Sequence, residues 1–201
     1  MSAIECINAS GWALPPCIIF KGKVFIELWF DGLPDDWRFE VSPSGWTSDE
    51  IGLRWLEKLF IPSTSLRTKG RYRLLILDGY GSYLTPKFDE ICERNKVIPI
   101  YIPLHSSYLL QPLDIGCFAV LKGLYSRIVE MKIRNGINYI DKLDLLEVYL
   151  EVRIEAFRSE IIKNSFGAAG LVPFIPDRVI LKLNIRLRTP IPTLSRGSES
   201  S

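Results

Sequence analysis

The feature that most constrains the fold is the apolar run from Arg73 to Leu77, which stops on Asp78 and Gly79. An unbroken apolar run of strand length predicts a strand buried on both faces. Asp78 would stand at the carboxyl end of that strand, where ligands bind in open α/β sheets. A second aspartate, Asp114, precedes another amphipathic run and is therefore predicted at the entry to a helix. The chain thus places two acidic side chains at positions that suit a site.

Two long motifs contain these aspartates. The first spans residues 78–86 (DGYGSYLTP), and the second spans residues 102–114 (IPLHSSYLLQPLD). Together they resemble the DDE superfamily endonuclease domain of pogo and Tigger transposases, a family that includes the centromere protein B group. The resemblance covers nearly all of residues 1–190, including residues 4–11 (IECINASG) and 170–174 (GLVPF). It implies an RNase H-like fold and a DNA substrate.

The resemblance matches Asp78 and Asp114 to the second and third members of the family's acidic triad. Phosphodiester cleavage and strand transfer need an activated nucleophile and a stabilised leaving oxygen, and carboxylate-bound Mg²⁺ or Mn²⁺ ions supply both. We therefore expect catalytic and metal-ligating roles for these two aspartates. Taken singly, Asp78 and Gly79 could equally form an ordinary turn, and Asp114 could equally be the N-cap of a helix. For His105, the single histidine of the chain, a structural hydrogen bond is the expectation.

The first member of the triad has no counterpart in this sequence, because in the family it lies upstream of the segment that residues 3–8 resemble. Glu5 is acidic but matches a non-catalytic position of the motif. Tyr80, Tyr83 and Tyr108 stand where the family usually carries histidines, and a tyrosine with a pKa of about 10 is no base at neutral pH. Two hypotheses follow. The first is a transposase-derived nucleic-acid-binding domain, ancestrally a metal-dependent DNA endonuclease and strand transferase but inactive as this fragment. The second is a non-catalytic DNA- or protein-interaction module, either domesticated or a transposon relic.

Hydrophobic periodicity predicts the other elements. A β-meander is expected over residues 2–8, 17–20 and 24–26, followed by an irregular connection over residues 31–44. A capping box at Thr47–Glu50 predicts a helix that ends near Phe60. The next predicted elements are a helix that starts at Thr85-Pro86 and a strand over residues 97–103, in which Pro99 indicates an edge position or a bulge. Three more helices are predicted over residues 114–132, 141–156 and 159–164. Gly167 and Gly170 are expected to break the last of them.

The predicted fold class is α/β: an RNase H-like mixed sheet flanked by helices, lacking its first strand and carrying a C-terminal helical extension. The predicted divisions are an endonuclease domain over residues 1–135 that is incomplete at its N-terminus, a helical extension over residues 136–183, and a basic, then Ser-rich, disordered tail over residues 184–201.

Composition narrows the partners. No stretch is long and apolar enough for a membrane span, and the first residues do not form a signal peptide, so a location inside the cell is expected. The four cysteines lack any Cys-x-x-Cys pair and are expected to be buried free thiols. A net charge of +2 is too small to indicate DNA binding alone, so local basic residues are the candidates: Lys69, Arg71, Lys122 and Arg127. The resemblance adds nuclear location and self-association or association with a full-length transposase.

Overall fold

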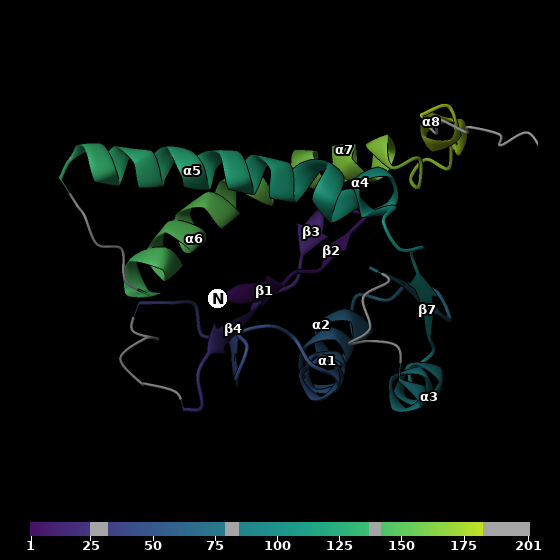
Figure 1. Ribbon diagram of the computed structural model, residues 1–201. Helices are drawn as coiled ribbons and strands as arrows, with labels where there is room; N and C mark the ends of the chain where they lie inside the picture. Colours follow the sequence, from purple (N-terminus) through teal and green to yellow (C-terminus); the bar gives the residue numbers. More distant parts are fainter. Residues whose placement is uncertain (25–31, 79–84, 137–141, 183–201) are drawn as a thin grey trace, which may run out of the picture.

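Small sheets and helices make up the architecture of the chain. The computed structural model describes residues 1–24, 32–78, 85–136 and 142–182, which form a mixed α/β protein. Figure 1 shows α5, α6 and α7 on one side of the first strands and α1, α2 and α3 on the other. The bounds of these helices are α1 Asp49–Trp55, α2 Ile61–Ser65, α3 Pro86–Arg94, α5 Phe118–Arg134, α6 Lys142–Ala156 and α7 Ser159–Ala168.

The N-terminal half contains a three-stranded sheet in the order β1-β4-β5. Its strands are β1 Ser2–Ile4, β4 Cys17–Lys21 and β5 Arg38–Ser42, and a separate hairpin joins β2 Ile7–Asn8 to β3 Trp12–Ala13. The antiparallel pairing of β1 with β4 confirms the strand predicted over residues 17–20, but the strand predicted over residues 2–8 is confirmed only in part, because β1 ends at Ile4 and β2 belongs to the separate hairpin. The prediction of an irregular connection over residues 31–44 is wrong in part, because β5 pairs in parallel with β4 there. Of the expected strand over residues 24–26, only Val24 is among the described residues.

The second sheet pairs β6 Arg73–Leu77 with β7 Val97–Tyr101 in parallel, and both strands confirm predictions. Leu75 and Leu77 are buried, but Leu74 is 59% exposed, so the prediction that β6 is buried on both faces is wrong. The amide of Ile102 donates to the carbonyl of Leu77 at 2.9 Å. Since alternate residues of a parallel strand bond to the same neighbour, the nitrogen of Pro99, which has no hydrogen, faces away from β6. The position of this proline therefore fits the edge strand that was predicted.

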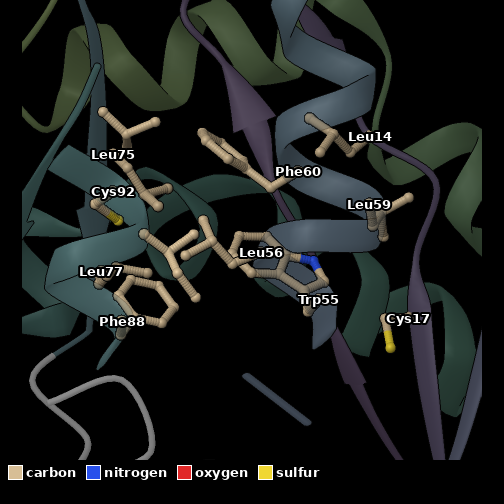
Figure 2. Close-up of a cluster of buried hydrophobic side chains, with 12 residues drawn as sticks. Leu14, Cys17, Trp55, Leu56, Leu59, Phe60, Leu75, Leu77, Phe88 and Cys92 are labelled. Carbon is tan, nitrogen blue, oxygen red and sulfur yellow. The ribbon is translucent and has the colours of Figure 1, made fainter. Parts of the chain in front are cut away.

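A long helical segment joins the two sheets through one hydrophobic cluster. It runs through α1, the π-helical turn η2 (Leu56–Phe60) and α2, five residues beyond the predicted end. Its N-cap is Ser48, whose hydroxyl accepts from the amide of Ile51, so the predicted cap at Thr47 is wrong by one residue. Figure 2 shows Trp55 and Leu56 of this segment beside the side chains that β6 and α3 contribute. This packing positions β6, which ends at Asp78.

The C-terminal helices largely follow the predictions. Val148, Val152 and Ala156 of α6 are buried, as the periodicity indicated. Helix α7 passes through Gly167 and stops before Gly170, whose φ of +66° lies in the left-handed region that glycine adopts readily. A short helix, α8 (Asp177–Ile180), follows and was not predicted. The tail expected over residues 184–201 lies outside the described residues, and the predicted domain boundaries remain predictions.

Two other expectations concern the whole chain. The four cysteines are free, and Cys17, Cys92 and Cys117 are buried whereas Cys6 is half-buried. Burial raises the pKa of Cys17 to about 12 and that of Cys92 to about 11, so these thiols stay protonated at neutral pH. Among the residues that the structure describes, no helix is both long and apolar enough to cross a membrane.

Candidate nucleic-acid and metal site

Asp78 follows the last residue of β6 directly. The burial of Leu75 and Leu77 in the core orients the strand, and the bond from Ile102 to Leu77 keeps the carboxyl ends of β6 and β7 side by side. Asp78 is half-buried. The turn predicted as its ordinary alternative begins at Gly79 and lies outside the described residues. The structure therefore places Asp78 at the sheet edge that the sequence predicted.

Asp114 is reached from β7 through a short connector. This connector consists of residues 103–106, helix α4 (Ser107–Leu110) and Gln111. The carbonyl of Gln111 accepts from the amide of Asp114 at 3.1 Å and thereby starts the π-helical turn η4 (Leu113–Cys117). Pro112, not Asp114, is the N-cap of this turn, so the N-cap alternative for Asp114 is wrong. π-Helical turns are rare and occur frequently at functional sites.

Packing behind η4 holds Asp114 in place. Leu113 and Cys117 are buried in a cluster with Ile162 of α7. Gly116 allows the close approach of α7, because a Cβ atom at this position would meet the hydroxyl oxygen of Ser165 at 1.9 Å. The turn that carries the aspartate is thus fixed by contacts with a helix about 50 residues away in the sequence.

The electrostatics of Asp114 combine burial with a nearby cation. Burial raises the pKa of Asp114 above its ordinary value, and the charge of Lys122 on α5 partly counteracts this effect. Lys122 is exposed and forms no salt bridge among the described residues. We therefore assign Lys122 to the same region as Asp114.

The donor chemistry of the site fits a hard divalent cation only in part. Carboxylate oxygens are the ligands that Mg²⁺ and Mn²⁺ prefer, and Asp78 and Asp114 are the carboxylates that the sequence singled out, one after β6 and one in η4. However, the described residues contain no group of three or more His, Cys, Asp or Glu side chains that could hold a metal ion. The two acidic residues expected from the sequence, Asp78 and Asp114, are both among the described residues.

The other sequence candidates lie in different places. Lys69 and Arg71 are exposed and precede β6, so they lie at the end of this strand opposite to Asp78. The five residues of β6 span roughly 17 Å at about 3.3 Å per residue. Arg127 is exposed on α5, the same helix as Lys122, and has no salt bridge in the described part of the chain. The basic candidates therefore form two groups rather than one surface.

Some neighbouring polar residues have structural roles or no partner. Arg73 donates to the Thr64 hydroxyl at 2.6 Å and to the Asn95 carbonyl at 2.7 Å, so this side chain has a structural role. Two further cations of α5 form salt bridges, Lys132 with Asp144 and Arg134 with Glu130. The imidazole of His105 has no hydrogen-bond partner among the described residues, so the structural bond expected for it is not found. His105 instead has a φ of +62°, which is uncommon for a residue other than glycine.

The sequence analysis missed a buried ionic network around Glu5. Arg153 of α6 donates to both carboxylate oxygens of Glu5, at 2.7 and 2.8 Å, and to the carbonyl of Leu14 at 2.6 Å. Tyr149 donates to the same carboxylate. The side chains of Glu5 and Arg153 are 0% and 15% exposed. No local pattern could reveal these contacts, because Glu5 and Arg153 are 148 positions apart in the sequence.

The described residues define a mixed α/β protein, and comparison with known proteins gives its family. The family model described as DDE superfamily endonuclease matches residues 1–166. The chain therefore belongs to the DDE superfamily endonucleases. This confirms the resemblance that the two motifs carried.

Several curated proteins are similar to this chain. Over 196 residues it is 45% identical to "MFS-type transporter clz9" of Cochliobolus lunatus, a match that covers 97% of this chain and 21% of that protein. Over 177 residues it is 26% identical to the Homo sapiens "Pogo transposable element with ZNF domain", covering 85% of this chain and 12% of that protein. The chain thus spans about a fifth or less of the length of these relatives. No solved structure matches the chain.

Proposed function

We propose that this chain is a transposase-derived domain that binds DNA across the sheet edge bearing Asp78 and across the start of α5. The observation that carries the proposal is that Lys122 is exposed on α5 without a salt bridge among the described residues, while its charge lowers the pKa of Asp114 at the end of the second family motif. A phosphate would be attracted to Lys122, and a divalent ion held by the aspartates would neutralise further phosphate charge. Arg127 is a second exposed cation of α5 without a salt bridge among the described residues.

We further propose that Asp78 and Asp114 ligate Mg²⁺ or Mn²⁺ and that the fold is RNase H-like. In support, β6 and β7 are parallel, and a hydrophobic cluster joins them to β4 through α1 and η2. Among the described residues, no strand pairs with the backbone groups of Leu74 and Ile76 that point away from β7. A strand at this place would bring a third carboxylate to the site in the family's arrangement.

Cleavage by this chain alone is expected to be slow or absent, because two carboxylates hold a divalent ion more weakly than three. The test is Mn²⁺-dependent nicking of supercoiled DNA by the purified chain, with Asp78→Asn and Asp114→Asn as controls. Nicking that both substitutions abolish would show that the two carboxylates suffice and would contradict the inactive interpretation. Absence of nicking by a cooperatively folded chain that still binds DNA would support it.

DNA binding is tested separately in the presence of EDTA, which prevents cleavage and removes the divalent ion, so that the contribution of the basic side chains is measured alone. Lys122→Ala should weaken binding to duplex DNA and lower the slope of log K against log salt by about 1, as expected for one lost phosphate contact. Lys69→Ala is the matched control at the other end of β6. Equal effects of both substitutions would mean that the duplex runs along β6 and reaches Lys69 and Arg71. No effect of Lys122→Ala would contradict the proposed surface.

The alternative is the second hypothesis from the sequence, a non-catalytic DNA- or protein-interaction module, of which the protein-interaction form is the one that DNA binding would distinguish. If the folded chain binds no DNA at low salt but associates with itself or with a full-length transposase, the module is the better description. Nuclear location belongs to the main proposal and can be tested by fluorescence microscopy of the tagged chain.

A further inference from the structure

The strand β6 has an outer edge that lies opposite to its partner β7. In a parallel pair, alternate residues of a strand bond to the same neighbour. The carbonyl of Leu77 accepts from the amide of Ile102, directly after β7, so the odd-numbered residues of β6 are the ones that bond to β7. The backbone groups of Leu74 and Ile76 therefore point away from β7, and no described residue bonds to them. They form a row of donors and acceptors at which another strand can pair.

The other strand edges carry features that hinder pairing with a second chain. Proteins protect strand edges with prolines, with charged side chains or by keeping the strand short. The outer edge of β7 contains Pro99, and β5 carries the charges of Arg38 and Glu40. Strands β1, β2 and β3 have three residues or fewer. The single charged residue of β6 is Arg73, whose side chain bonds within its own chain. Among the described strands, β6 thus has the one edge of five residues without such protection.

The side chains along this edge are apolar and partly exposed. Leu74 is 59% exposed, Ile76 is half-buried, and Tyr72, directly before the strand, is 51% exposed. Side chains two positions apart in a strand lie on the same face of the sheet, so these three form one apolar row. A further strand beside β6 would remove part of this row from water, which is favourable.

An antiparallel pair of two β6 strands satisfies this edge. In an antiparallel pair, opposite residues that exchange both hydrogen bonds alternate with opposite residues that exchange none. A twofold axis at Leu75 sets Leu74 of one copy opposite Ile76 of the other, and these are the residues whose backbone groups point outward. All of these outward groups then have partners in the second copy. Such a contact is closed, because both copies use the same surface.

The charges around β6 fit a second copy in this orientation. Lys69 and Arg71 are exposed and precede β6, whereas Asp78 follows it. With the axis at Leu75, Asp78 of one strand lies opposite position 72 of the other, next to Arg71. A parallel pair would instead set the basic starts of both strands side by side. Opposite charges across two strands stabilise a sheet, and like charges destabilise it.

We propose that two copies of this chain associate by antiparallel pairing of their β6 strands about Leu75. The second sheets of both copies then form one sheet in the order β7-β6-β6-β7. This inference goes beyond the proposed function, because it concerns contact between copies of the protein and does not depend on DNA binding. It assigns the self-association expected from the sequence to one strand edge.

Sedimentation velocity of the full chain over a concentration series, without DNA, measures the association. The wild-type chain should shift from the monomer mass toward twice that mass as the concentration rises. Leu74→Pro removes an outward N–H that β7 does not use, in the way that Pro99 lacks one on β7, and this loss occurs in both copies. It should weaken the association roughly 10- to 100-fold.

A matched pair of lysine variants separates the edge of the sheet from its face. Leu74→Lys places a charge at the paired edge and should also weaken the association. Ile98 is the neighbour of Leu74 on β7, lies on the same face and is 46% exposed. Ile98→Lys should leave the association unchanged, because β7 lies at the outer side of the joined sheet. Circular dichroism reports whether each variant folds, and Leu74→Lys keeps the test valid if the proline variant does not.

Cysteine pairs test the register. Opposite residues that exchange both hydrogen bonds have Cα atoms about 5.5 Å apart, which suits a disulfide. The double variant Leu74→Cys with Ile76→Cys should therefore form a covalent dimer on mild oxidation. The control is Ile98→Cys with Ile100→Cys, two β7 residues that are 46% and 45% exposed, and it should remain uncrosslinked.

Three results would overturn the inference. The first is a folded wild-type chain that stays monomeric at every concentration. The second is a dimer that Ile98→Lys weakens as much as Leu74→Lys, because the contact would then lie between the apolar faces of the sheets. The third is a dimer that neither substitution of Leu74 weakens and that the cysteines at positions 74 and 76 do not crosslink, which would assign the association to another surface.

Discussion

Replacing Arg153 with methionine tests the importance of the buried network that fixes α6 to the first sheet. The substitution removes two hydrogen bonds to Glu5 and one to the carbonyl of Leu14. It also removes a cation 4.8 Å from the ring centre of Phe157. Tyr149 remains as a donor to the Glu5 carboxylate, whose side chain is 0% exposed. The variant thus leaves a buried negative charge without a counter-charge.

The expected cost is large compared with the stability of a typical domain. Breaking a buried ion pair by removing one partner costs about 3–5 kcal/mol. Domains have unfolding free energies of roughly 5–15 kcal/mol. For a chain of this length, the midpoint temperature of thermal unfolding should decrease by about 10 °C. Urea titration followed by far-UV circular dichroism measures the change.

The pH dependence gives a sharper test. Burial raises the pKa of Glu5 above its ordinary value of 4.5, while Arg153 and Tyr149 act in the opposite direction. Without Arg153 the pKa in the folded state rises further. A raised folded-state pKa contributes stability that is fully present below the unfolded value and is lost as the pH rises through the folded value. The destabilisation of Arg153→Met should therefore be largest near pH 7 and smaller near pH 4.

A variant without charges checks the cause. Glu5→Leu, Tyr149→Phe and Arg153→Met together remove the whole network, and the combination should cost less than Arg153→Met alone, because no buried charge is left unpaired. A loss below about 1 kcal/mol in the single variant, or a loss that does not depend on pH, would refute the reasoning.

Three further predictions concern local features. Gly116→Ala should destabilise the chain by about 1–3 kcal/mol in urea titration, because the new Cβ would lie 1.9 Å from the Ser165 hydroxyl oxygen. The loss of stability should be smaller in a Ser165→Ala background, and an equal loss in both backgrounds would contradict this contact. Thr85→Ala should cost about 1 kcal/mol by removing the cap that accepts from the amide of Phe88 at 3.2 Å, whereas Thr85→Ser should not. Phe88→Ala should cost about 3–5 kcal/mol, because this side chain is 0% exposed in the main cluster, and a cost under 1 kcal/mol would mean that the cluster collapses around the gap.

Local chemistry explains which parts of the fold could be predicted. The apolar run that forms β6, the Thr85-Pro86 helix start and the periodicity of α6 are encoded by residues close together in the chain. Strand β5 escaped prediction because its pairing with β4 depends on contacts beyond the segment itself. The exposure of Leu74 could not be predicted for a related reason, since an apolar run does not reveal whether other elements cover both faces of the strand.

The sequence by itself determined the family and the positions of Asp78 and Asp114 at a strand end and a helix entry, because motif order and hydrophobic period are local properties. Only the tertiary structure decided which charges meet. It brought Arg153 to Glu5, and it placed Lys69 at the end of β6 opposite to Asp78. The physical reason is that charge interactions depend on distance and burial, and both are set by how distant segments pack.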